Sequence, residues 1–268
     1  MSPVSKQRAD ILLVEQGLAD SRSMAQRLVM AGQVRVDGQV LSKPSIQISP
    51  QSRLEVIALP KYVSRGGLKL EAALEAFASD VAGSVCADIG SSTGGFTDCL
   101  LQRGAKRVYA IDVGRNQLHW KLRKDERVVV MEKTNARHLE SLPEPIDLIT
   151  IDASFISLEL LLPKAKQWLI PQGRVIALIK PQFEAGREEA KRGKGVIRDS
   201  GVHRRILLEV LGFAAKHGFG IRGLIASPVI GPKGNVEFLA EFGQSPEPSL
   251  DFEEMVETAL ESASLEQK

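Results

Sequence analysis

The sequence is poor in cysteine and in aromatic residues, and it has no long apolar run. Its 268 residues include only Cys86 and Cys99, neither of which has metal-ligand neighbours in the sequence, so we predict no disulfide framework and no metal site. No stretch approaches the roughly 18 apolar residues of a membrane span, and no apolar segment precedes the first charges. These absences predict a protein of the reducing cytoplasm with no membrane partner, and we expect a monomer.

Charge is distributed unevenly along the chain. The formal net charge is +2, but residues 245–268 hold seven acidic residues against a single lysine, so the rest of the chain carries +8. A basic body favours a polyanionic partner. A solvated basic face with no partner is the alternative that charge alone leaves open.

Residues 85–97 predict a strand, a glycine turn and a helix. An apolar run that contains Asp88 stops at Gly90, and a helical pattern begins at Phe96. Glycines there allow positive φ and close approach of a ligand, and the helix N-terminus offers free N–H groups. The dinucleotide fingerprint would need glycine at position 92, which is Ser92. The turn predicts a nucleotide-like cofactor without a pyrophosphate, with a ligand-free glycine turn as the alternative.

The spacing Asp-x-Gly-x-x-x-Gly-Gly resembles the first motif of S-adenosylmethionine-dependent methyltransferases. Asp88 would accept from an amine or hydroxyl of that cofactor, and Asp112, which ends the next strand, from the ribose hydroxyls. Asn135 would border the adenine. The residues predicted to bind the cofactor are Asp88, Gly90, Ser91, Gly94, Gly95, Phe96, Asp112, Asn135 and Asp152.

The first sixty residues predict two short helices and a β-hairpin. Gly17 and Gly32 end the two helical patterns, and Asp37-Gly38 is a strong hairpin signal. The order and spacing of Arg8, Ser21, Arg22, Gly32, Val34, Val36, Gly38 and Lys43 resemble the αL RNA-binding module. The resemblance implies that cations of this unit contact RNA phosphates, namely Arg8, Arg22, Arg27, Arg35 and Lys43. A helical capping domain with solvated arginines is the alternative.

Beyond residue 65, strand and helix signals alternate. Strands are predicted at residues 107–112, 128–131, 146–152, 174–180, 221–226 and 236–242. This alternation is typical of an α/β fold with an open, mostly parallel, Rossmann-like sheet. We therefore divide the chain into an α+β RNA-binding domain (1–60), a linker (61–64), the α/β domain (65–245) and an acidic C-terminal helix (246–268).

Polar residues at strand ends are the candidates for catalysis, since ligands bind beyond the carboxyl ends of parallel strands. Asp152 and Lys180 end two apolar strands, and Glu237 lies near the start of the last strand. Lys69 lies in the first turn of a predicted helix, where the helix dipole disfavours a cation, so it is either solvated or used in chemistry.

In these contexts Lys69, Asp152, Lys180 and Glu237 match the Lys-Asp-Lys-Glu tetrad of the FtsJ-related ribose 2′-O-methyltransferases. With the segments at residues 62–67 and 180–184, the whole chain resembles the TlyA family, named hemolysin A. The resemblance implies an enzyme that methylates ribosomal RNA, at a cytidine 2′-hydroxyl, within ribosomal subunits. Lys180 would act as the base or stabilise the alkoxide, helped by burial and by the second cation Lys69, while Asp152 and Glu237 orient the lysines.

Residues 184–205 form a glycine-rich, basic excursion, which we interpret as an RNA-contacting lid, with a solvated loop as the alternative. Its predicted RNA contacts are Lys191, Arg192 and Arg198, and we add Arg65, the first residue of the α/β domain. Three other functions stay open at this point. They are a nicotinamide oxidoreductase, a non-catalytic RNA-binding or ribosome-assembly protein, and a pore-forming hemolysin.

Overall fold

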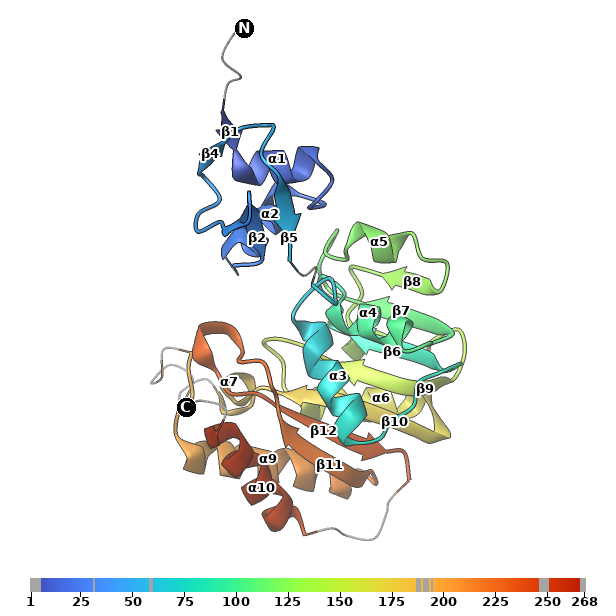
Figure 1. Cartoon of the computed structure of the whole chain (residues 1–268). Coiled ribbons are helices and arrows are strands. Elements are labelled where there is room, and N and C mark those ends of the chain that lie inside the picture. Colours follow the sequence, from blue (N-terminus) through green and yellow to red (C-terminus); the bar gives the residue numbers. More distant parts are fainter. Residues whose placement is uncertain are drawn as a thin grey trace, which may run out of the picture. The chain divides into compact units, whose positions relative to one another are not determined.

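The computed structural model describes residues 6–30, 32–57, 60–186, 189, 193, 195–245 and 251–265. The chain divides into two compact units, Met1–Lys61 and Tyr62–Lys268, and each is described by itself (Figure 1). Tyr62 is 4% exposed and its hydroxyl donates to Glu71, so the predicted linker residue packs into the core of the second unit.

The N-terminal unit contains the predicted helices and hairpin. Asp37 (φ 50°) and Gly38 (φ 85°) both have positive φ, as the turn of a tight hairpin requires. Leu13, Leu28 and Val34 pack in the centre of a small apolar core. Its elements are β1 (Gln7–Arg8), α1 (Ala9–Glu15), α2 (Arg22–Met30), β2 (Val34–Val36), β3 (Gln39–Val40), β4 (Gln47–Ile48) and β5 (Leu54–Val56).

The second unit is built on a seven-stranded sheet in the order β11-β12-β10-β9-β6-β7-β8. β12 pairs antiparallel with both of its neighbours, and the other pairings are parallel. The mostly parallel α/β fold is thereby confirmed. The strands are β6 (Val85–Ile89), β7 (Arg107–Ile111), β8 (Val128–Met131), β9 (Ile146–Ile151), β10 (Leu169–Ile179), β11 (Gly220–Ala226) and β12 (Phe238–Gly243).

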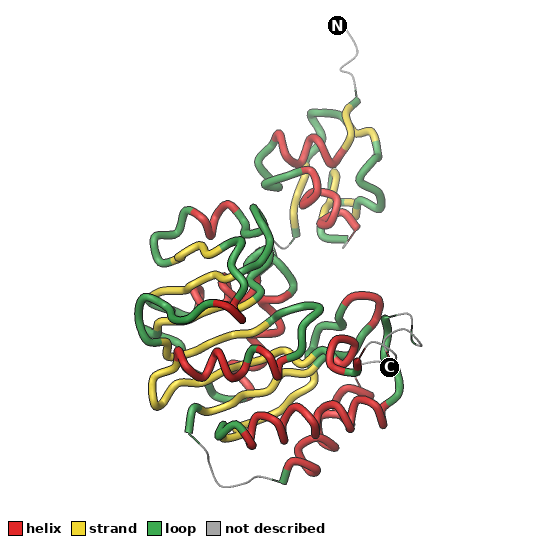
Figure 2. Tube along the Cα trace, turned by 180° about the vertical axis from the view of Figure 1, so that it is seen from behind, coloured by secondary structure: helices red, strands yellow, loops and turns green. Residues whose placement is uncertain are grey.

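Helices cover both faces of this sheet. α3 (Gly66–Ala76) and α4 (Gly95–Gln102) pack on one face, together with α5 (Trp120–Arg123). On the other face lie α6 (Leu162–Trp168), α9 (Ser200–Lys216) and α10 (Phe252–Leu265), and Figure 2 shows this side. Short helices are η1 (Ala136–His138), η2 (Leu158–Leu160), α7 (Pro181–Glu184) and η3 (Pro232–Gly234).

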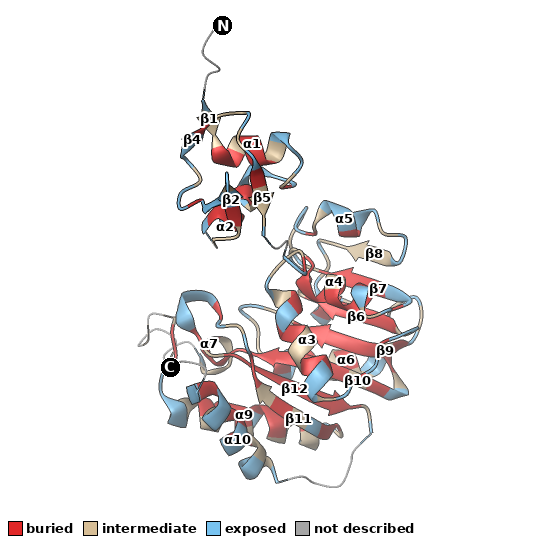
Figure 3. Ribbon diagram, viewed as in Figure 1, coloured by how far each residue is buried: buried red, intermediate tan, exposed pale blue. Residues whose placement is uncertain are grey.

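Burial follows this layering. All five residues of β6 are buried, and the central strands are buried along most of their length (Figure 3). The acidic C-terminal helix α10 packs on β11 and α9 through Val256, Ala259 and Ala263. Its acidic side faces outward, where Glu257 binds Arg204. Within the described residues, no helix is both long enough and apolar enough to cross a bilayer.

The strand directions bring distant residues to one edge of the sheet. Asp112, Asp152 and Lys180 each follow the carboxyl end of a parallel strand. β12 runs in the opposite direction, so Glu237, the residue before it, lies at the same edge, and Ile179 pairs with Phe238 in the register. The last strand therefore brings its amino end to the edge where the parallel strands end.

Candidate active site

The glycine turn after β6 is shaped by two close approaches. Gly90 has φ +83°, and a Cβ there would lie 2.8 Å from the carbonyl oxygen of Asp152. Gly94 has φ +98° and caps α4, and a Cβ there would overlap Leu122. Only glycine meets both demands at these positions. The turn is therefore fixed against β9 on one side and α5 on the other.

Asp88 lies beneath this turn and lines neither of the pockets described below. It is fully buried, and its carboxylate accepts from the Thr97 amide (3.0 Å), the Thr97 hydroxyl (2.7 Å) and the Thr150 hydroxyl (3.0 Å). Burial raises the pKa of Asp88 to about 7, and the threonine hydrogen bonds oppose that shift. In this structure Asp88 ties the N-terminus of α4 to β9, where the sequence suggested direct contact with a ligand.

A pocket of about 280 Å³ lies beyond β6, β7 and β9. Apolar walls from Ile111, Ile156 and Leu161 face polar groups of Asp112 and Asn135. The Asp112 carboxylate accepts from the amides of Ser92 (2.8 Å) and Gly114 (2.6 Å), which fixes its orientation at the rim. An apolar slot with an acid at one end suits a nucleoside.

A second pocket of about 370 Å³ adjoins the first, since both are lined by Gly90, Ser92, Asp152 and Ser154. All four predicted catalytic residues line it, although they come from α3 and from the ends of three strands. Of the predicted cofactor residues, Gly94 lies outside both pockets, as Asp88 does. Those that line one or both are Gly90, Ser91, Gly95, Phe96, Asp112, Asn135 and Asp152.

Lys180 is held by a ring of oxygen atoms. Its Nζ lies 2.5 Å from Asp152 Oδ1 and donates to the carbonyl oxygens of Asp152 (3.3 Å) and Ala153 (3.2 Å) and to the Ser154 hydroxyl (3.1 Å). Lys180 is 6% exposed, whereas the Asp152 side chain is 26% exposed. The pair is thus desolvated on the lysine side and open to a ligand on the carboxylate side.

Lys69 forms the second pair, with Glu237 at 2.5 Å. The Glu237 side chain is completely buried, and its other oxygen accepts from Gln182 Nε2 at 3.3 Å. The carboxylate also leaves no room for a Cβ at Gly231. The alternative that Lys69 is solvated is therefore wrong, since its ammonium is buried in an ion pair. Gln182, two residues after Lys180, was not identified as a site residue from the sequence, because its role depends on the contact with Glu237 that the fold creates.

The loop after Asp152 was also not identified. Phe155 is 90% exposed, lines the smaller pocket and has φ +63°, which is rare for a bulky residue and common at functional sites. Its ring centroid lies 4.7 Å from that of Phe183. Glu184 accepts from the Ser157 hydroxyl (2.6 Å) and the Leu158 amide (3.0 Å), so α7 and this loop are tied together.

In the N-terminal unit, two of the predicted RNA contacts are held by a buried acid. Arg8 and Arg22 both bind Asp10, which is fully buried, at 2.8 Å and 3.0 Å. Gln26 adds a third donor at 2.8 Å. Hydrogen bonds from these partners, Arg8 first, hold the pKa of Asp10 well below its usual range. Arg8 and Arg22 therefore also organise the unit, a role that spacing alone did not reveal.

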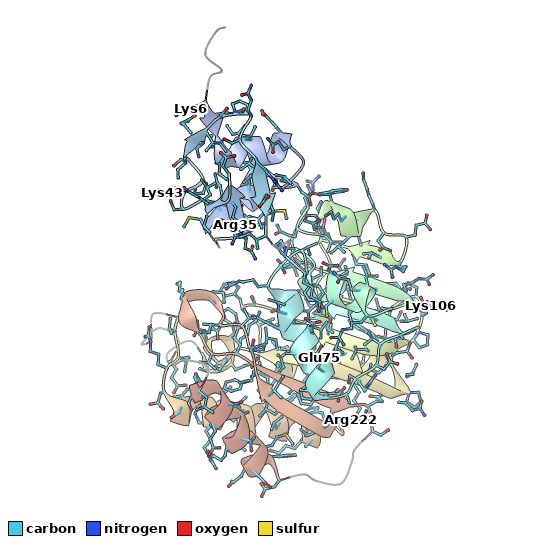
Figure 4. All side chains as sticks on the ribbon, viewed as in Figure 1. Lys6, Arg35, Lys43, Glu75, Lys106 and Arg222 are labelled. Carbon is cyan, nitrogen blue, oxygen red and sulfur yellow. The ribbon has the colours of Figure 1, made fainter. Side chains whose placement is uncertain are left out.

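The remaining predicted RNA contacts lie in different places. Arg27, Arg35 and Lys43 are exposed on the N-terminal unit, where Figure 4 labels the last two. Arg65 lines the larger pocket, and Arg198 is exposed. Lys191 and Arg192 lie outside the described residues. No cluster of three or more possible metal-ligating side chains occurs in the described part of the chain.

The sequence and fold are similar to those of known proteins. The family description FtsJ-like methyltransferase matches residues 62–244, and the S4 domain matches residues 7–54. A candidate rRNA methyltransferase of Bacillus subtilis, YqxC, is 52% identical over 87% of this chain and 84% of its own. The 16S/23S rRNA (cytidine-2′-O)-methyltransferase TlyA of Mycobacterium tuberculosis is 46% identical over 86% and 87%. A solved structure of a hemolysin candidate from Streptococcus thermophilus is 44% identical over 98% of both chains, with a TM-score of 0.77.

Proposed function

The chain belongs to the FtsJ-like methyltransferase family, and we propose that it transfers methyl groups from S-adenosylmethionine to ribose 2′-hydroxyls of ribosomal RNA, at cytidine, within ribosomal subunits. The observation that carries the proposal is the convergence of Lys69, Asp152, Lys180 and Glu237 on one pocket that adjoins a nucleoside-sized slot.

The residues of the smaller pocket fit the cofactor. The Asp112 oxygens each accept one backbone amide, and a carboxylate oxygen can accept more than one hydrogen bond, so capacity remains for ribose hydroxyls. Asn135 and the apolar wall would flank the adenine, and Gly90 lines both pockets. When bound, S-adenosylmethionine supplies an electrophilic methyl group on its sulfonium.

Lys180 is the group we assign to the acceptor hydroxyl. As an ammonium paired with Asp152, it donates a hydrogen bond to the oxygen on which negative charge develops as the 2′-hydroxyl attacks. As a neutral amine, it removes the proton from that hydroxyl. The four oxygens around Nζ hold it in place, and because an ammonium has only three N–H groups, the acceptor hydroxyl would replace one of the longer contacts. In either role, the rate gain comes from placing the hydroxyl in line for attack.

Lys69 and Glu237 support this arrangement from the side of α3 and β12. Their pair is neutral overall, so it lines the pocket with polar groups without adding net charge next to Lys180. Glu237 also fixes the Gln182 amide, which lies on the helix that begins directly after Lys180. We assign Lys69 and Glu237 to orienting the acceptor ribose and keeping the position of α7.

The N-terminal unit would hold the RNA. Its match to the S4 domain and its exposed cations support phosphate contacts that position the RNA without reading its sequence. Phe155 offers an exposed ring at the mouth of the cofactor slot, where it can stack on a base next to the reacting ribose.

Transfer of a tritiated methyl group tests the proposal directly. Purified protein is incubated with tritiated S-adenosylmethionine and with 30S subunits, 50S subunits or protein-free ribosomal RNA from cells that lack the gene. We expect label in RNA, and ribose-methylation mapping should then place it at cytidine 2′-oxygens. Label on a base, or none with any RNA substrate although the cofactor binds, would contradict the proposal and favour a non-catalytic RNA-binding role.

A further inference from the structure

The loop that follows β9 is anchored at its two ends and open to solvent between them. Residues 152–158 are here called the β9 loop, and its first five residues line the smaller pocket. Its start is fixed by the sheet, because the amide of Asp152 donates to the carbonyl oxygen of Ile89 at 2.9 Å. Its end is fixed by the buried side chain of Leu158. Residues 154–157 are exposed or half-buried, so other contacts must hold this part of the loop.

Glu184, the last residue of α7, holds the exposed part of the β9 loop. Its carboxylate accepts from the Ser157 hydroxyl at 2.6 Å and from the Leu158 amide at 3.0 Å, with one donor on each oxygen. Burial raises the pKa of Glu184, and both hydrogen bonds oppose that shift. The Ser157 hydroxyl oxygen accepts in turn from the Glu159 amide at 3.2 Å, at the start of η2. Glu184 therefore joins the β9 loop to the turn that begins directly after Lys180.

Phe155 lies in this part of the loop, in a backbone conformation that its side chain does not favour. It has φ +63° and is 90% exposed, so neither backbone preference nor burial holds it there. Such conformations persist only where the surrounding structure maintains them. The contacts that maintain this one come from α7, namely the Glu184 hydrogen bonds and the Phe183 ring, whose centroid lies 4.7 Å from that of Phe155. Without Glu184, the loop should relax toward a more common conformation.

We propose that Glu184 is a positioning residue for methyl transfer, which holds the β9 loop in place through Ser157 and Leu158. The inference rests on the proposed function. Glu184 lines neither pocket, so it acts only through the loop. The loop supplies a wall of the smaller pocket and the Ser154 hydroxyl that accepts from Lys180. A relaxed loop would therefore change the cofactor site and the surroundings of the catalytic ammonium at once.

This role gives Glu184 a different signature from Lys180. Removal of Lys180 takes away the group that acts on the acceptor hydroxyl and leaves the smaller pocket intact, so cofactor affinity is kept. Removal of Glu184 displaces a wall of that pocket together with a partner of Lys180, so cofactor affinity and kcat fall together. A merely structural role would lower the free energy of unfolding and leave both quantities unchanged in the folded protein.

The test uses Glu184→Ala and Glu184→Gln in the full chain. Cofactor affinity is measured by calorimetry, and the rate of transfer is measured in single turnovers with a tritiated methyl group and saturating ribosomal subunits. For Glu184→Ala we expect affinity about tenfold weaker, because hydrogen bonds to a charged acceptor are lost. The transfer rate should fall about 10²-fold, the effect of a displacement of about 1 Å at a reacting group. Glu184→Gln should recover most of both, since its carbonyl oxygen can accept from Leu158 while its amide donates to the Ser157 oxygen.

The matched control is Glu144→Ala. Glu144 is also half-buried and also accepts from a hydroxyl, that of Tyr109 at 2.8 Å, but it precedes β9 and so lies at the opposite edge of the sheet. The control should keep the wild-type affinity and rate. If Glu184→Ala matches the control, the inference is wrong while the proposed function stands. A wild-type protein that transfers no methyl group to any RNA refutes the proposed function, whereas the affinity measurement still decides whether Glu184 holds the loop.

Ser157→Ala keeps the inference testable if Glu184→Ala does not fold. This variant removes the Ser157 hydroxyl and leaves the hydrogen bond from the Leu158 amide to Glu184. Cofactor affinity and transfer rate should both fall, each by a smaller factor than in Glu184→Ala. Wild-type values of both quantities in Ser157→Ala would overturn the inference.

Discussion

The two units of this protein use their charges in opposite ways. In the N-terminal unit the acid is buried and the cations lie outside, since Asp10 is fully buried while Arg8 and Arg22 extend from it toward solvent. In the second unit the cations themselves are buried, because Lys69 and Lys180 are 8% and 6% exposed and each is paired with a carboxylate. We call the solvent-facing cations of the N-terminal unit outward cations and the buried lysines of the second unit inward cations. An outward cation can bind a polyanion, whereas an inward cation can act on a single atom of a bound substrate.

This difference predicts different kinds of loss on mutation. Removing an outward cation takes away one of several screened contacts, so the effect is small and depends on salt. Removing an inward cation takes away a unique interaction and leaves a buried partner uncompensated, so the effect is large and independent of salt. The four predictions below test this contrast, from the largest effect to the smallest.

Lys180→Ala should abolish methyl transfer, with a loss in kcat of at least about 10³-fold, because no other described side chain reaches Asp152 with a cation. The measurement is single-turnover transfer of a tritiated methyl group, with cofactor affinity followed by calorimetry. Affinity should stay near the wild-type value, since Lys180 does not line the nucleoside slot. Turnover within tenfold of wild type would refute the assignment of Lys180.

Glu237→Gln should lower the free energy of unfolding of the second unit by about 3–5 kcal/mol, because it leaves the Lys69 ammonium buried without a counter-charge. Urea unfolding followed by tryptophan fluorescence reports on this unit alone, since Trp120 and Trp168 are the only tryptophans. The double variant Lys69→Met/Glu237→Gln should regain most of the stability without regaining activity. If activity returned with stability, the pair would have a structural role only.

Thr97→Val should destabilise the second unit more at pH 8 than at pH 5, by about 1–3 kcal/mol at the higher pH, because a hydrogen bond to a charged acceptor is lost. The pKa of Asp88 is about 7 in the folded protein, above its value in the unfolded chain. The folded state therefore binds the proton more tightly, and stability falls as the pH rises from about 4 to 7. Losing the Thr97 hydroxyl should raise the Asp88 pKa further and extend that fall to higher pH. The exposed Thr258→Val serves as the control, and equal losses at both pH values would contradict the prediction.

Arg35→Ala/Lys43→Ala should weaken binding to ribosomal subunits by about tenfold at low salt and less at high salt, with kcat unchanged. The measurement is KM for subunits at several salt concentrations. Arg53→Ala is a suitable control, since that exposed arginine of the same unit is already paired with Glu55. A change in kcat would mean that outward and inward cations do not differ as proposed.

The sequence predicted the fold well, because the fold depends on the alternation of strand and helix patterns. The four pocket residues were selected from polar strand ends together with the resemblance to the Lys-Asp-Lys-Glu tetrad; they line one pocket, and their catalytic roles stay a prediction. It missed what depends on three-dimensional partners. Asp10 lies in a helical pattern like any first-turn acid, and only the folded unit brings Arg8, Arg22 and Gln26 to it. Asp88 is turned away from the pockets by the threonines of α4 and β9, which lie 9 and 62 residues away in the chain. The exposure of Trp120 was not predicted from the sequence, since an aromatic residue close to Leu122 is more often part of a core.

The antiparallel strand β12 has a consequence for the order of folding. It lies between β10 and β11, although it follows both in the sequence, and the Lys69–Glu237 contact that it brings about joins residues 168 positions apart. Contacts of such long range form late, because the loop they close must first be ordered. The parallel strands can assemble earlier and present Lys180 and Asp152, but the Lys69–Glu237 pair is absent until β12 inserts. Methyl transfer should therefore be the last native property to return on refolding, after the tryptophan signal of the sheet and its helices.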